Sequence, residues 1–157
     1  MLKTLFGSHG AGGPTSRDDD DSEVEALLQR VSESRHAAER RDALARLRDM
    51  LQDSPQAQQA VGVMGLPVLL AVVTEDRDDT ELTRTALEAL ALSFGGGEGG
   101  RASGGGTPAA RAAARGEGPP PPGVMNAELF ARSPDNVRLL LSLLEDEPVG
   151  VDDFYCR

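Results

Sequence analysis

Aromatic residues, cysteine and histidine are scarce in this 157-residue chain, which has four Phe, one Tyr, no Trp, one Cys and two His. A core must therefore be built from Leu, Val, Met and Ala, which favours packed helices over a sheet. The one cysteine, Cys156, excludes an internal disulfide and is typical of a reducing compartment. The longest apolar run, Leu66 to Val73, is far shorter than the roughly 20 residues of a membrane-spanning helix, and the N-terminus does not have the pattern of a secretory signal. We expect a cytoplasmic protein.

No constellation of reactive side chains stands out. His9 and His36 lack Cys, His or paired carboxylates at ligand spacing, which argues against a metal site. The run Asp18–Asp21 lacks the spaced ligands and turn glycine of a calcium loop, and a solvated acidic tail is its expected role. Neither Gly-rich segment has the flanking pattern of a phosphate loop, and Cys156 has no histidine partner. We expect no catalytic residue, no cofactor, no metal and no enzymatic activity.

The charge and the low-complexity segments limit the partners and the size of the core. The formal net charge is −10, and an acidic chain repels phosphate backbones, so nucleic acid is not expected as a partner. Most of the 18 Gly and 10 Pro gather in two stretches. We expect residues 1–21 to be a disordered acidic N-terminal tail and residues 95–123 to be a disordered Gly/Ala/Pro-rich linker.

Apolar residues recur at helical spacing elsewhere, and no segment alternates with period two for long enough to be a strand. The first helix is expected to begin after Ser22, which has capping-box spacing to Glu25. A second helix is expected from about 37 to 52. A third, short helix begins at Ser54-Pro55 and is expected to end at Gly65.

Two further helices are expected before the linker and two after it. Leu66-Pro67 opens one, since proline is tolerated in the first helical turn, and Thr80 is the expected N-cap of the next. Helical spacing returns near Phe130 and again in 137–146, after the capping segment Ser133-Pro134-Asp135. The residues expected to be buried are Val24, Leu27, Leu28, Val31, Ala43, Leu44, Leu47, Met50, Leu51, Ala57, Ala60, Val61, Met64, Val68, Leu69, Val72, Val73, Leu82, Ala86, Leu87, Leu90, Phe94, Ala127, Leu129 and Phe130.

Two internal matches indicate a repeat. Arg41–Leu47 aligns with Arg84–Leu90 at an offset of 43, and Leu69–Glu75 aligns with Leu140–Asp146 at an offset of 71. Without the 28-residue low-complexity insert 95–122, the second offset also becomes 43. Chance matching of Leu-rich helices is the alternative interpretation. A period of roughly 40–47 residues with two or three helices per unit is typical of armadillo and HEAT repeats.

The repeat predicts an all-α fold, an armadillo/HEAT-like α-solenoid that is truncated and carries a long disordered Gly/Pro-rich insert. One such unit cannot bury its own apolar face, and stacking completes the core and leaves a long shallow surface. The segment Val61–Val73, a short helix, a glycine turn and an apolar–Pro–x–Leu helix start, resembles the armadillo pattern. We expect residues 22–94 to form armadillo-like repeats and 124–157 to begin the next.

Three other features have alternative interpretations. Pro119–Pro122 could be a polyproline II ligand or a stiff spacer in the linker. Leu2, Leu5 and Phe6 could be a weak membrane anchor or part of a frayed tail. Some charged side chains could contact partners or be solvated helix ends: Arg40, Arg41, Arg77 and Asp78.

Several segments occur together in the order of one known family. They are Arg40–Leu44, the glycine turn before Leu66-Pro67, Asp76–Asp79 with Ala86–Leu90, Asn136–Glu145, and Asp153-Phe154-Tyr155 before Arg157. These segments resemble the armadillo-like head domain of the general vesicular transport factor family of Golgi vesicle-tethering proteins, in particular its plant-like or algal-like members. The likeness covers about 24–94 and 124–157.

The resemblance implies a cytosolic protein attached peripherally to Golgi and transport-vesicle membranes, tethering vesicles in ER-to-Golgi and intra-Golgi transport. Family members are long homodimers with a coiled-coil tail, and their partners are Rab-type GTPases, golgins and SNARE proteins. This sequence lacks the coiled coil and most of the head, and the block Glu147–Val151 interrupts the family pattern. A truncated or imperfect gene product would explain the last two departures. A generic armadillo scaffold with a Pro-rich docking segment is the alternative function.

Overall fold

A computed structural model describes residues 17–95 and 119–145 of the chain. The expectations for residues 1–16, 96–118 and 146–157, with most of the linker and the chain end, lie outside the described residues. The described residues form helices and no strand, which confirms the all-α class. The helices are α1 (Arg17–Glu33), α2 (Ala37–Asp53), α3 (Pro55–Ala60), the π-helical turn η1 (Val61–Gly65), α4 (Leu66–Glu75), α5 (Thr80–Ser93), α8 (Pro122–Ala131) and α9 (Pro134–Glu145).

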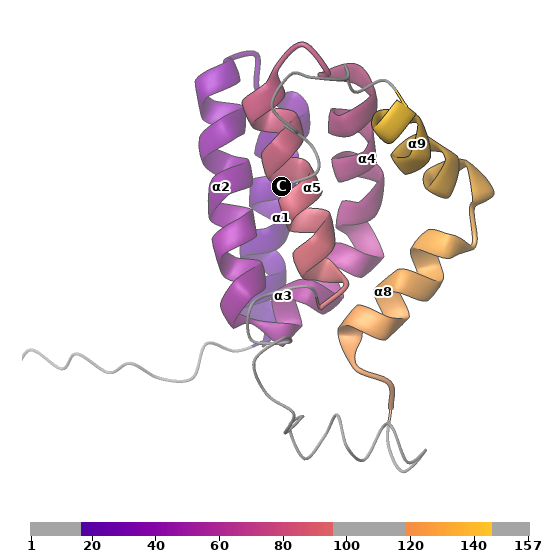
Figure 1. Ribbon diagram of the computed structural model, residues 1–157. Helices are drawn as coiled ribbons and strands as arrows, with labels where there is room; N and C mark the ends of the chain where they lie inside the picture. Colours follow the sequence, from indigo (N-terminus) through magenta and orange to yellow (C-terminus); the bar gives the residue numbers. More distant parts are fainter. Residues whose placement is uncertain (1–16, 96–118, 146–157) are drawn as a thin grey trace, which may run out of the picture.

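The helices form a pile in which equivalent segments of the internal match lie next to one another. In Figure 1, α1 and α4 run in one direction and α2 and α5 in the other. Helix α2 packs on α1 and on α5, its partner at an offset of 43, while α4 packs on α5. Helix α8 packs on α3, η1 and α5, and α9 packs on α8. These contacts are those expected of stacked repeats, and the armadillo type itself stays a prediction.

The core is aliphatic, as the composition predicts. Leu44 and Leu47 of α2, Leu69 of α4, and Val31 of α1 are completely buried, and each contributes about 1.5–3 kcal/mol through burial. Most residues expected to be buried are buried, but Met50, Met64, Val68, Leu87 and Phe94 are only partly covered, and Ala127 and Leu129 are exposed. The partly covered residues pack against the edge of the core.

Helix α1 begins at Arg17, earlier than the predicted start at Ser22. The run Asp18–Asp21 is therefore helical and not part of a disordered tail. Acidic side chains in a first turn are stabilised by the positive end of the helix dipole. A tertiary contact adds to this, since Ser54 Oγ donates a hydrogen bond to Asp20 Oδ2 at 3.0 Å.

Gly65 does not end the third helix, contrary to the prediction. Its φ of −91° and ψ of −29° are right-handed helical, and the chain is helical without a break from Pro55 to Glu75. Pro67 lacks an N–H and its ring crowds the carbonyl four residues earlier. The wider π turn η1, in which the Leu66 N–H bonds to Val61 O, accommodates this proline inside one helix.

This continuous run of 21 residues is long and apolar enough to cross a membrane by length and composition alone. Sequence analysis underestimated it because it divided the run at Gly65. Half of its most apolar window is buried within the protein, and its segments pack on α1, α2, α5 and α8. Such burial is that of a core helix.

Two other helix starts differ from prediction by one or two residues. Asp79, not Thr80, caps α5, because its carboxylate accepts from the Leu82 N–H at 3.1 Å. Helix α8 begins at Pro122, within the predicted linker, which was expected to run to residue 123. Ser54 caps α3 as expected, accepting from the Ala57 N–H at 3.1 Å.

Candidate protein-interaction surfaces

The charged residues singled out in the sequence serve mainly to join helices. Arg40 makes a bidentate ion pair with Asp76 at 2.7 and 2.6 Å, and its Nε donates to Val31 O at 2.7 Å. Its side chain is 21% exposed. Arg40 thus links the end of α1 to the end of α4, and its interpretation as a solvated helix end is wrong.

Two more ion pairs follow along the α2–α5 interface. Arg41 bonds to Asp79 at 2.9 Å and Arg48 to Glu88 at 3.3 Å. Burial of Asp79 raises its pKa, but hydrogen bonds from Arg41 and from the Leu82 N–H outweigh this, so the pKa lies below its usual value. Both pairs therefore join α2 to α5.

The remaining candidates are not assembled into a reactive site. Arg77 Nη2 lies 3.4 Å from Ser142 Oγ of α9, and Asp78 is exposed. His36 is exposed at the N-cap of α2 and makes no side-chain cap bond. No group of three His, Cys, Asp or Glu side chains suited to a metal occurs in 17–95 and 119–145. His9 and Cys156 lie outside those ranges.

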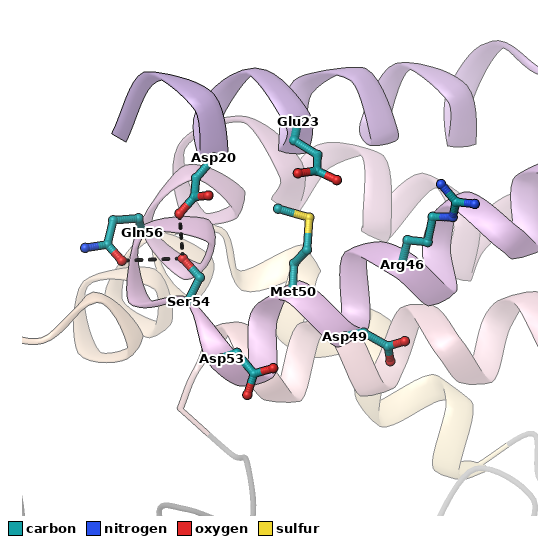
Figure 2. Close-up of a pocket in the computed structure, with 8 residues that line it drawn as sticks. All are labelled: Asp20, Glu23, Arg46, Asp49, Met50, Asp53, Ser54 and Gln56. Atoms are coloured by element: carbon teal, nitrogen blue, oxygen red, sulfur yellow. Dashed lines mark hydrogen bonds between the residues drawn. The ribbon is translucent and has the colours of Figure 1, made fainter. Parts of the chain in front are cut away.

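An open groove of about 590 Å³ lies between α1 and α2 at the end next to α3. Figure 2 shows Glu23 above Met50, with Asp49 and Asp53 projecting from α2 beside them. Arg46 at the far side of the groove pairs with Asp42 at 3.3 Å. The full lining is Asp20, Glu23, Arg46, Asp49, Met50, Asp53, Ser54 and Gln56.

Four carboxylates against one guanidinium give this groove a negative potential. Clefts lined by one sign of charge attract the opposite charge and repel the same one. The groove is therefore suited to Lys- or Arg-bearing protein segments and unsuited to phosphate or anionic lipid. The apolar thioether of Met50 at its centre adds an adaptable contact.

Asn126 of α8 is a buried polar contact that sequence analysis missed. It is 2% exposed, and its Nδ2 donates to Gln58 O at 2.7 Å and to Ser93 O at 2.9 Å. It occupies the space beside Gly62, where a Cβ would lie 1.6 Å from Asn126 Oδ1. This amide joins α8 to both α3 and α5, which precede residues 96–118 in the sequence whereas α8 follows them. In the sequence, the only indication of this contact was a single polar residue among the apolar residues of the helix.

The end of the pile formed by α8 and α9 exposes several large apolar side chains. Outward-facing Val137, Leu141 and Leu144 of α9 are 42%, 53% and 56% exposed. Val124, Met125 and Leu129 of α8 are also exposed. Large exposed apolar side chains gathered on one side of a protein are candidates for contact with another surface.

Comparison with known proteins gives one relationship. The chain is 34% identical over 145 residues to Golgin candidate 6 of Arabidopsis thaliana, which covers 92% of this chain and 14% of that protein. No family model matches the sequence, and no solved structure matches it. The described residues thus define an all-helical fold, and the sequence relates the chain to a protein named as a golgin. The chain spans about one seventh of that relative's length.

Proposed function

We propose that this chain is part of a helical head that tethers vesicles in ER-to-Golgi and intra-Golgi transport, acting by binding proteins and not by catalysis. The similarity to a golgin over 92% of the chain is the observation that carries the proposal. The stacked helices support it, because a pile of repeats offers an extended surface for partners. The place of action is the cytoplasmic side of Golgi and transport-vesicle membranes.

Attachment to these membranes runs through protein partners. A net charge of −10 and the acidic α1–α2 groove disfavour direct contact with anionic lipid. Rab-type GTPases, golgins and SNARE proteins are the partner classes of the proposal. A basic segment on such a partner is the kind of ligand that fits the groove, and Glu23 on α1 and Asp53 on α2 are two of its exposed carboxylates.

The test is recruitment in cells together with direct binding. The tagged chain is expected to localise with a Golgi marker and to be captured by a GTP-loaded Rab-type protein, a golgin or a SNARE in a purified panel. A Glu23→Lys/Asp53→Lys variant should lose this recruitment, whereas Glu128→Lys/Glu145→Lys, at exposed positions of α8 and α9, is the charge-matched control. Diffuse distribution and no binding to any member of the panel would refute the proposal. Equal recruitment of both variants would exclude the groove as the contact.

The alternative, a generic scaffold with a Pro-rich docking segment, has one observation in its favour. Pro119 and Pro120 are exposed, and Pro121 has the polyproline II dihedrals φ −61° and ψ 150°. Pro122, however, belongs to α8, so only three prolines are available to a ligand-binding domain. If this alternative holds, replacing Pro119–Pro121 by Ala should abolish binding to SH3 or WW domains. If it does not hold, the same replacement should leave Golgi recruitment intact.

A further inference from the structure

Helix α9 is apolar on two of its sides. Leu143 is 4% exposed and belongs to the core, whereas Val137, Leu141 and Leu144 form a second face at positions i, i+4 and i+7. Within the described part of the chain, α9 makes its main contact with α8 alone. Figure 1 shows α9 at the outer edge of the pile, beyond α8 and next to α4. A second apolar face on a terminal helix is the feature to be explained.

The internal sequence match relates this face of α9 to one face of α4. At an offset of 71, the exposed residues of α9 correspond one by one to residues of α4. The pairs are Leu66 and Val137, Leu70 and Leu141, and Val73 and Leu144. In α4, Leu66 is 7% and Val73 0% exposed, and Leu70 is partly buried.

Helix α4 also has a neighbouring helix of a kind that α9 lacks among the described residues. Helix α4 packs extensively on α5, which begins five residues after α4 ends. Along α5, Leu82, Ala86 and Leu90 recur at i, i+4 and i+8 and are buried. The described residues provide no such helix for α9. The α4–α5 interface therefore shows which kind of helix the α9 face fits.

We propose that the outer face of α9, formed by Val137, Leu141 and Leu144, is a docking site for an amphipathic helix of the α5 kind. This helix belongs to the next unit of a stack of repeats in a longer polypeptide and packs on α9 as α5 packs on α4. The match to a relative of which this chain covers only 14% is consistent with such a longer stack. The inference does not depend on a role at the Golgi.

A peptide with the sequence of residues 76–95 is the probe, because it contains the α4–α5 connection and α5 itself. The full chain is labelled at its Leu and Val methyl groups and titrated with this peptide by NMR. The methyl resonances of Leu141 and Leu144 should shift. A peptide with Leu82→Asp and Leu90→Asp should leave them unchanged. Leu144→Ser in the full chain should weaken binding at least about tenfold.

Val63→Ser is the matched control variant, since Val63 is 75% exposed on η1, away from α9, and its loss should leave the affinity unchanged. Both substitutions are at exposed sites, so circular dichroism should show unaltered helicity and melting. Three results would overturn the proposal. They are equal shifts with both peptides, no shift at millimolar peptide, and self-association by sedimentation that Leu144→Ser abolishes, which would assign the face to a second copy.

Discussion

Gly62 and Asn126 form the most sharply testable contact in this protein. A Cβ built on Gly62 would lie 1.6 Å from Asn126 Oδ1 and 2.4 Å from its Cγ. Gly62→Ala therefore has to displace the Asn126 amide, which is 2% exposed and donates to two carbonyls, Gln58 O and Ser93 O. The two residues should be strongly coupled energetically.

The sign of the Gly62→Ala effect should depend on Asn126. Losing the two hydrogen bonds of the buried Asn126 amide costs about 2–4 kcal/mol, and alanine in place of helical glycine offsets about 1 kcal/mol, for a net destabilisation of about 1–3 kcal/mol. In an Asn126→Ala background the space is open and only the helix-propensity gain remains. There, Gly62→Ala should stabilise by about 1 kcal/mol, a coupling of about 2–4 kcal/mol.

Urea unfolding of the four variants, followed by circular dichroism, measures this coupling, and hydrogen exchange in α8 shows whether that helix undocks. Ala26→Gly at an exposed position of α1 is the control and should cost about 0.5–1 kcal/mol in either background. Equal cost of Gly62→Ala in the presence and absence of Asn126 would refute the proposed packing of α8.

Three further predictions concern the interior and the ion pairs. Leu44→Ala, at a completely buried site, should lower the unfolding free energy by about 2–5 kcal/mol in urea. Arg40→Lys should lower the unfolding free energy by about 1–3 kcal/mol, because lysine loses the bidentate pair and the bond to the end of α1. The control is Arg46→Lys, at a side chain that is 64% exposed, which should cost under about 0.5 kcal/mol. Equal costs would contradict the linking role of Arg40. Asp79→Asn keeps a capping oxygen but loses the charge paired with Arg41. Because the folded pKa of Asp79 is lowered, its stabilisation is present above the unfolded pKa of about 3.9 and is lost as the pH falls through the folded pKa. The difference in unfolding free energy from the parent chain should therefore shrink as the solution is acidified, and a difference independent of pH would contradict this.

The features predicted from the sequence are those that depend on local spacing. Leucine, valine and alanine at helical intervals were enough to place the helices and most of the core, including Leu44, Leu69 and Leu82. The offset of 43 also predicted correctly that the segments around Leu44 and Leu87 belong side by side, since α2 packs on α5. Each of these inferences needs only the 3.6-residue period of a helix and the requirement that apolar faces be covered.

Inferences about helix ends and polar residues were less successful. Gly65 was interpreted as a helix terminator, yet the chain remains helical through it. Arg40 was interpreted as a solvated charge, yet it holds together the ends of α1 and α4. The functions of both residues depend on groups far away in the sequence, which no local pattern contains.

The sequence by itself determined that this protein is helical, aliphatic in its core and acidic overall, because all of these follow from composition and periodicity. Only the tertiary structure decided that Asn126 fills the space left by Gly62 and that Leu144 is exposed where its counterpart Val73 is buried. The physical reason is that the sequence of a helix shows how apolar each of its faces is. Which neighbour covers it, and which carbonyl a buried amide finds, depends on where other helices come to rest.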